Sequence, residues 1–353
     1  MNTLLLGDPS PSLQWRAAVE LEGIAHDDDD VQASCAEIRE SAAIRSLLAR
    51  LEAARNRPTA AGYLLCQLAY LGYRGPELSM AVEAMFAHQQ SDGSWPAQAP
   101  SPSQSRPEPA VVWLDDDSDQ PARKGQPLAD GPRFVTMQTV VPLRGIAAAG
   151  FAADPGAERA YEWLLRERLP DGSWPAGPKA DLGGPGRPSP PEKDYRRLPR
   201  GAGCRSATTG VVACFALHPE RRRSDAARIG VDHLLARETR DESTLGWEVS
   251  RLVGLERAMG QITFYVTFDP AFLLDLASRC GVSAADRRVR DLVTWLETVR
   301  GPYGLWEHHA HPQLSRWLTF DLECSLRRLA DGDWIGNEEP AGFTSSKRGN
   351  RRY

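Results

Sequence analysis

Four segments of the chain repeat apolar residues at three- and four-residue spacing, the pattern of a helix with one buried face. They cover residues 80–86, 161–165, 229–235 and 289–296. Proline or a small polar residue stands near each start, as is typical of helix N-termini. We therefore predict four amphipathic helices.

A second set of segments is apolar on all sides, which is typical of helices that neighbours enclose completely. These segments are residues 64–73, 135–151, 206–217, 264–276 and 317–329. Because the two kinds of segment alternate, we predict an all-α fold of about five or six helix pairs in two concentric layers.

A turn containing glycine and tryptophan follows each amphipathic segment. The four tryptophans are Trp95, Trp174, Trp247 and Trp306. Their spacing exceeds the roughly 20–50 residues of common solenoid repeats, so each interval should hold one repeat and an insertion. Glycine supplies the left-handed backbone that ends a helix, and tryptophan can then cover the helix end.

The first turn, Gln-Ser-Asp-Gly-Ser-Trp at residues 90–95, and its Asp-Gly-Ser-Trp copy at 171–174 resemble the Gln-Trp repeats of the squalene-cyclase and prenyltransferase superfamily. The resemblance extends from about residue 58 to 329. It implies an α/α toroid with a single ring, because two-ring cyclases need about twice this length. The third turn departs from the family pattern in lacking Asp-Gly.

Length and composition are compatible with one domain. The chain has 353 residues, of which 41% are hydrophobic and 25% charged. We expect a toroid over residues 1–335, comprising N-terminal helices at 1–57 and long loops at 96–133 and 175–205, followed by a flexible basic tail at 336–353. Loops of such length are usually functional or disordered.

Charge and hydropathy limit the partners and the location. A net charge of −5 gives no reason to expect nucleic-acid binding, and no run of about 18 apolar residues suggests an integral membrane segment. The N-terminus lacks a signal-peptide pattern, so a cytoplasmic protein with free cysteines is expected. The oligomeric state stays open.

The first long loop contains an acidic cluster, Asp115, Asp116, Asp117 and Asp119. Asp115, Asp116 and Asp119 match the Asp-Asp-x-x-Asp pattern with which prenyl-diphosphate enzymes hold Mg²⁺. The cluster also approaches the Asp-x-Asp-Asp motif of class II cyclases, in which a protonated aspartic acid is the proton donor. A solvated acidic loop is the alternative. The aspartates at 27–30 fit Asp-x-Asp-Asp formally but precede a predicted helix at 31–51, where they should cap its N-terminus.

Further candidates lie near the predicted inner helices. His309 and His311 follow the fourth turn and could transfer protons near neutral pH. Charged residues in apolar surroundings suggest a polar cavity, and aromatic rings could stabilise cations. The candidates for substrate binding are Arg144, Arg205, Phe264, Tyr265, Phe268, Arg316, Trp317 and Asp321.

Two hypotheses of function follow. The first is a terpene-cyclase-like isomerase or lyase acting on a small apolar or prenyl-diphosphate substrate, by protonation-initiated cyclisation or Mg²⁺-assisted loss of diphosphate. The second is a non-catalytic helical scaffold or ligand-binding protein that uses its long loops. An enzyme predicts a deep aromatic cavity with a carboxylate pointing inwards, whereas a scaffold predicts a filled centre or an open groove.

Overall fold

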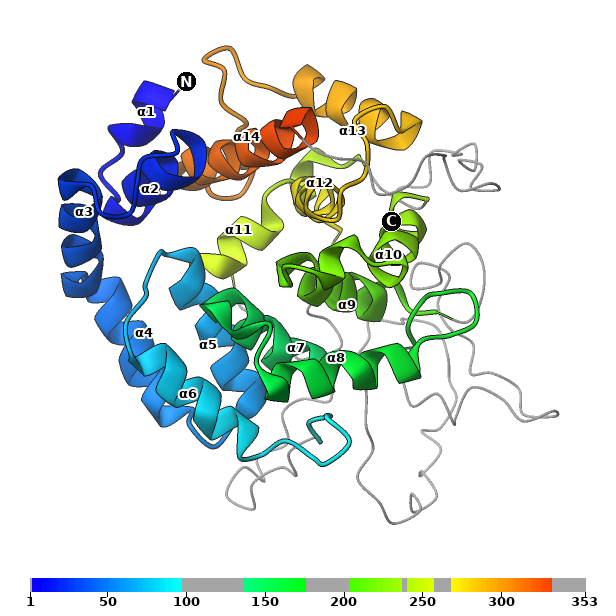
Figure 1. Ribbon diagram of the computed structural model, residues 1–353. Coiled ribbons are helices and arrows are strands. Elements are labelled where there is room, and N and C mark those ends of the chain that lie inside the picture. Colours follow the sequence, from blue (N-terminus) through cyan, green and yellow to red (C-terminus); the bar gives the residue numbers. More distant parts are fainter. Residues whose placement is uncertain (1, 97–135, 176–202, 237–239, 257–267, 332–353) are drawn as a thin grey trace, which may run out of the picture.

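The computed structural model describes residues 2–96, 136–175, 203–236, 240–256 and 268–331, and this part of the chain is helical (Figure 1). It contains fourteen α-helices. An isolated β-bridge joins Arg300 and Trp306. The predicted all-α class is confirmed.

The chain begins with α1 (Asn2–Leu6) and α2 (Pro11–Arg16), which continues into the π-helical turn η1 (Ala17–Leu21). α3 (Asp29–Glu40) and α4 (Ala42–Ala53) replace the single helix predicted at 31–51. The break occurs because Ser41 is extended and its hydroxyl accepts a hydrogen bond from the Ile44 amide, which starts a new helix. Asp28 caps α3 by accepting from the Asp30 amide, as expected for a capping role.

The segments that are apolar on all sides form buried helices. They are α5 (Pro58–Tyr70), α7 (Thr136–Ile146, followed by the π-helical turn η3 Ala147–Phe151), α9 (Arg205–Leu217), α12 (Pro270–Arg279) and α14 (Ser315–Asp331). Every residue of α7 is buried. The absence of a polar face in these segments therefore correctly predicts that the helices are buried.

The amphipathic segments form α6 (Glu77–Phe86), α8 (Pro155–Glu167), α10 (Asp225–Leu235) and α13 (Arg287–Thr298). α6 packs on α5, α8 on α7, α10 on α9 and α13 on α12, and α10 also contacts α12. In α13 only Val289, Leu292 and Leu296 are buried, which is the single apolar face that the spacing predicts.

The buried helices contact one another in chain order, from α5 through α7, α9 and α12 to α14 (Figure 1). α14 in turn contacts α1 and η1 at the beginning of the chain. Arg16, at the end of α2, lies 4.3 Å from the centre of the Tyr70 ring on α5. The short helix α11 (Trp247–Leu252) packs against the buried helix α5.

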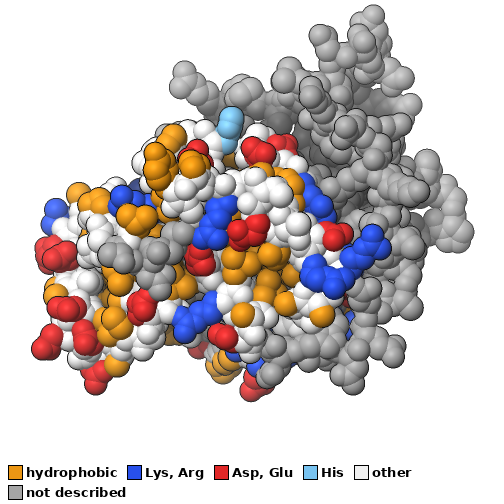
Figure 2. Space-filling view, turned by 90° about the horizontal axis from the view of Figure 1, so that it is seen from above, with side chains coloured by type: hydrophobic (Ala, Val, Ile, Leu, Met, Phe, Trp, Pro, Cys, Tyr) orange, Lys and Arg blue, Asp and Glu red, His pale blue; other side chains and the backbone are white. Residues whose placement is uncertain are grey.

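The surface is mixed in character. Figure 2 shows one face on which acidic, basic and hydrophobic side chains are interspersed, with no large area of one charge sign in its coloured part. None of the described helices combines the length and the apolar character that a membrane-spanning segment needs.

Three of the four tryptophan turns share one pattern of hydrogen bonds. In each, the indole Nε1 donates to the carbonyl of the residue ten positions earlier in the outer helix, and the tryptophan amide donates to a threonine hydroxyl of the next inner helix. The indole bonds join Trp95 to Met85 (2.9 Å), Trp174 to Leu164 (2.7 Å) and Trp306 to Leu296 (2.8 Å). The amide bonds join the same tryptophans to Thr139 (3.1 Å), Thr208 (3.1 Å) and Thr319 (2.9 Å).

The third turn differs from the prediction. Trp247 is partly exposed and begins α11, so the Gly-Trp pair is not a copy of the other turns. The turn that repeats lies a few residues earlier, at Asp241 and Ser243. The Ser243 amide and hydroxyl both donate to Asp241 Oδ1, at 2.9 and 2.7 Å. Ser94 and Ser173 make the same pair of bonds to Asp92 and Asp171. Thr244 therefore stands where the other turns have tryptophan.

Replacing Gly93 with alanine should destabilise the fold more than an ordinary left-handed glycine would. Gly93 has φ +96°, and an added Cβ would lie 2.2 Å from the Arg159 carbonyl oxygen of α8. Gly23 is the matched control, because it has φ +70° but open space around a Cβ. We expect Gly93→Ala to cost roughly 1–3 kcal/mol more than Gly23→Ala in urea-induced unfolding, since backbone must shift to relieve the clash. Equal costs would show that this turn does not lock against α8.

Neighbouring threonines on α9 provide a second test. Thr208 accepts the Trp174 amide, whereas the buried hydroxyl of Thr209 has no hydrogen-bond partner in the described structure. Thr208→Val should cost about 1–3 kcal/mol because it leaves a buried N–H unpaired, while Thr209→Val should be neutral or stabilising. Thermal unfolding of the two variants measures this difference, and a similar loss in both would contradict the assigned role of Thr208.

Candidate functional site

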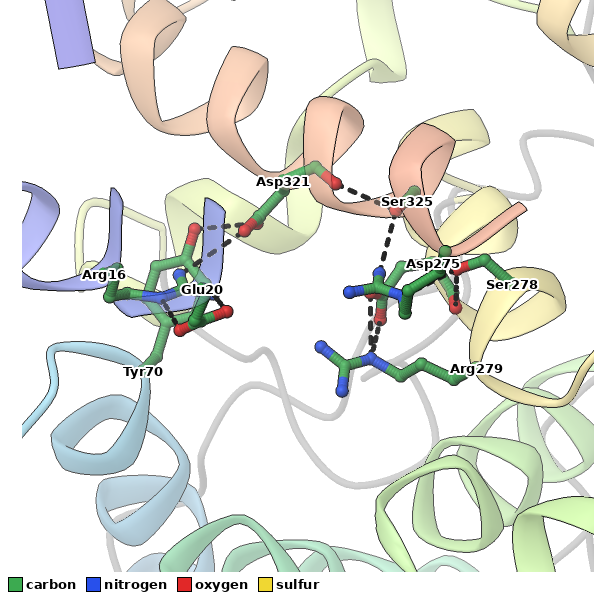
Figure 3. Close-up of polar contacts among 9 residues, drawn as sticks. Arg16, Glu20, Tyr70, Asp275, Ser278, Arg279, Asp321 and Ser325 are labelled. Carbon is green, nitrogen blue, oxygen red and sulfur yellow. Dashed lines mark hydrogen bonds and ion pairs between the residues drawn. The ribbon is translucent and has the colours of Figure 1, made fainter. Parts of the chain in front are cut away.

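Nine polar side chains meet where α2 with η1, α5, α12 and α14 approach one another (Figure 3). We call this group the inner polar cluster. Its residues belong to the last turns of α2 and α5, to η1, to the second half of α12 and to the middle and second half of α14. The members are Arg16, Glu20, Tyr70, Asp275, Ser278, Arg279, Asp321, Ser325 and Arg328. Arginine is favourable near helix C-termini, where the helix dipole is negative.

Asp321 is the central carboxyl of this cluster. Its Oδ2 accepts a hydrogen bond from the Tyr70 hydroxyl at 2.7 Å, and its Oδ1 lies 3.4 Å from Arg16 Nη1. Burial raises the pKa of Asp321 to about 6; Arg16 works in the opposite direction, and the charge of Asp275 adds to the rise. Asp321 therefore changes its protonation state near neutral pH. Asp321 is nevertheless not sealed off, because 22% of its side chain is exposed.

Tyr70 and Arg16 hold Asp321 in place. Burial and the neighbouring Asp321 charge raise the pKa of Tyr70 well above its usual value, so its hydroxyl remains a hydrogen-bond donor. Trp317 stacks on the Tyr70 ring with centroids 5.4 Å apart. The Arg16 guanidinium lies between the rings of Tyr70 and Phe320. It also binds both carboxylate oxygens of Glu20, at 2.8 and 3.2 Å.

Asp275 is shared by two arginines. Arg279 Nε lies 2.9 and 3.0 Å from its two oxygens, and Arg328 Nη2 lies 2.5 Å from Oδ1. Burial alone would raise the pKa of Asp275, but the two guanidiniums outweigh it and lower the pKa. Ser278 and Ser325 fix Arg328 through further hydrogen bonds of 3.0 and 3.1 Å. Asp275 thus stays ionised near neutral pH. Asp321, on the neighbouring helix, is protonated once the pH falls below its pKa of about 6.

A second buried group surrounds Glu248 of α11. Glu248 pairs with Arg144 of α7 at 2.6 Å and also with Arg251. These two arginines overcome the effect of burial and keep the pKa of Glu248 below its usual value. Tyr63 and Gln67 of α5 donate to the Arg251 carbonyl at 3.0 and 2.9 Å. Arg144, a predicted substrate-binding residue, therefore anchors α11.

Arg205 and Phe268, both predicted to bind substrate, lie against each other with the guanidinium carbon 3.6 Å from the ring centre. Next to them, burial raises the pKa of Asp269 to about 6. Its oxygens, however, accept the amides of Gly246, Glu248 and Ala271, and only 5% of the residue is exposed. Asp269 is thus a helix cap that joins α11 to α12, in contrast to the accessible Asp321.

The predicted Arg316 does not join Asp321. Its guanidinium pairs with Asp8 at 2.9 Å, and 38% of the side chain is exposed. The two residues lie five positions apart on α14, which points them in different directions. Of the remaining described candidates, Trp317 reaches the cluster through Tyr70.

The predicted histidines do not form a shared site. His309 is exposed, and His311 Nε2 lies 3.0 Å from Glu256 Oε1. The buried member of the run is His308, which contacts the Gly246 carbonyl at 3.1 Å and whose pKa is lowered by burial. Within the described part of the chain, no three His, Cys, Asp or Glu side chains are grouped as a metal site requires.

Several sequence-based candidates lie outside the described residues. They are the acidic positions Asp115, Asp116, Asp117 and Asp119, with the predicted Mg²⁺ ligands among them, and the aromatic positions Phe264 and Tyr265. Most of both long loops falls outside as well.

Only Asp321 of the cluster was among the predicted site residues. The eight others are Arg16, Glu20, Tyr70, Asp275, Ser278, Arg279, Ser325 and Arg328. A signal for them exists in the sequence. Arg16 and Glu20 are four positions apart, as are Asp275 and Arg279, and each pair lies in a mostly apolar helix. Polar pairs at helical spacing on an otherwise buried helix indicate a polar interior.

No model of a known protein family matches the sequence, and the search of curated proteins also gave no match.

Proposed function

We propose that this chain is a single-ring α/α-toroid enzyme of terpene-cyclase-like type, in which Asp321 donates a proton to a substrate held among the inner helices. The observation that carries the proposal is an accessible carboxyl with a pKa of about 6, bound by a tyrosine and next to an arginine. A general acid works best when its pKa lies near the working pH.

The helix contacts support the ring. The buried helices contact one another from α5 to α14, α14 contacts η1, and Arg16 meets Tyr70 of α5, so the series returns to its beginning. The amphipathic helices pack on α5, α7, α9 and α12 as an outer layer. The three tryptophan turns join each outer helix to the next inner one in the same way.

The neighbours of Asp321 suit proton donation. After the proton leaves, the Tyr70 hydroxyl and the Arg16 guanidinium stabilise the remaining carboxylate. The stacked Tyr70 and Trp317 rings provide π-faces next to the acid, and such faces attract positive charge. An isoprenoid or similarly apolar substrate is the class to which this chemistry applies. Mg²⁺-assisted loss of diphosphate at Asp115, Asp116 and Asp119 is the second route of the proposal.

The direct test incubates the full-length protein with linear prenyl diphosphates of several lengths, with and without Mg²⁺, and analyses cyclised and dephosphorylated products. Asp321→Asn should lower kcat roughly 100-fold or more if Asp321 is the acid. Glu323→Gln is the matched control on the same helix, because Glu323 binds Arg300 instead of the cluster. Loss confined to Asp115→Asn with full activity in Asp321→Asn would favour the Mg²⁺ route, and no product from any substrate would favour the scaffold.

The raised pKa of Asp321 predicts a specific pH dependence of stability. The folded protein binds this proton more tightly than the unfolded chain, so the associated stability is fully present below about pH 4 and is lost as pH rises through about 6. Relative to Asp321→Asn, the free energy of unfolding of the wild type should fall by on the order of 3 kcal/mol across this window. Urea titrations at several pH values measure the difference, and a pH-independent difference would show that Asp321 titrates normally.

A further inference from the structure

Arg279 presents an unusual half-bound guanidinium to the inner polar cluster. Its Nε binds both oxygens of Asp275, at 2.9 and 3.0 Å, whereas neither terminal nitrogen has a hydrogen-bond partner among the described residues. In Figure 3 these two nitrogens point away from Asp275 and towards the side where Arg16 and Glu20 lie. The side chain is 27% exposed, so the free end of the fork is accessible.

The other arginines of the cluster are more completely bound. Arg16 binds both oxygens of Glu20 and approaches Asp321 with its third nitrogen. Arg328 is held by Asp275, Ser278 and Ser325. Arg16 Nη1 lies near Asp321 without a hydrogen bond, and Arg328 bonds through Nε and Nη2. Arg279 differs from both in leaving its two terminal nitrogens open among the described residues.

When Asp321 is protonated, the local charge also favours an anion at this place, because three guanidiniums then face only the carboxylates of Glu20 and Asp275. Arg279 and Arg328 share the single carboxylate of Asp275, and Glu20 already binds Arg16 in a bidentate manner. The free end of the Arg279 guanidinium is accessible, and a bidentate oxyanion would give its terminal nitrogens charge-assisted hydrogen bonds. Arginine matches the planar geometry of carboxylate and phosphate oxygens better than lysine does.

We propose that Arg279, oriented by Asp275 and supported by Arg328, binds an anionic group of the substrate, a carboxylate or a phosphate. This inference rests on the proposed function for the identity of its ligand as a substrate. Whether Arg279 binds an anion can be measured without any enzymatic turnover. An anion here would fix one end of a substrate within the cluster that contains Asp321.

Isothermal titration calorimetry of the full-length protein tests the site without turnover. The probes are inorganic phosphate, pyrophosphate, acetate and decanoate at constant ionic strength. We expect at least one class to bind and Arg279→Gln to weaken its binding at least tenfold, with Arg279→Lys intermediate because it keeps the charge but loses the fork. Arg45→Gln, at an exposed position on α4, should bind as the wild type does. Preferential binding of the phosphate probes or of the carboxylate probes shows which of the two anionic groups the site recognises.

A second measurement needs no variant. Phenylglyoxal modifies accessible guanidinium groups, and peptide mapping by mass spectrometry reports each arginine separately. Arg279 should react in the free protein and be protected by the anion that binds. Absence of binding by every probe, equal binding by Arg279→Gln, or modification of Arg279 unaffected by the anion would overturn the proposal. Anion binding at Arg279 without any product in the prenyl-diphosphate assay would leave this site standing and contradict the proposed function.

Discussion

The structure depends on the double anchoring of buried tryptophans between successive helices. Each indole covers the end of an outer helix and satisfies its own N–H at a carbonyl of that helix, while the backbone amide binds the next inner helix. A buried indole N–H without a partner would be costly, so the bond selects one orientation of the ring. Because the same device recurs at three turns, it connects α6 to α7, α8 to α9 and α13 to α14 in one uniform way.

The third repeat shows how this constraint can be satisfied differently. Thr244 stands in place of tryptophan, and its hydroxyl donates to the Phe268 carbonyl at 2.8 Å. Asp269 then accepts the amides of Gly246 and Glu248 and also caps α12. In this repeat the Asp269 carboxylate, at the start of the inner helix, accepts hydrogen bonds from backbone amides. In the other repeats a tryptophan indole donates a hydrogen bond to a carbonyl of the outer helix. The chain that follows forms α11, which contacts α5 and pairs with α7 through Glu248 and Arg144.

The sequence predicts the helices well because burial leaves a local trace. α9 is buried over residues 205–216 and has no charged or polar face after its first turns, while α13 has one apolar face, and the sequence shows both patterns at the expected positions. The motif Gly-Trp at 246–247 misled because it matches the letters of the repeat and lacks its serine-aspartate turn, which lies a few residues earlier. The candidate site was mostly hidden because tertiary contacts assemble it. Tyr70 and Asp321 are 251 positions apart, and no local pattern joins them. The adjacent histidines suggested a site by proximity in sequence, yet the structure gives them separate partners.

The pairing of inner charges also limits where a substrate could be held. Arg144, predicted to bind substrate, is paired with Glu248, and removing either partner would leave a charge buried without compensation. Arg205 lies against Phe268, and Arg316 is paired with Asp8. The predicted cationic positions are therefore occupied by contacts within the protein. In the proposed enzyme, a polar substrate group would find open donors in the inner polar cluster instead, beside the carboxyl whose pKa burial has raised to about 6. Protonation of Asp321 would remove one negative charge from this cluster and make an anion there more favourable, so anion binding and proton donation would be coupled through the same few side chains.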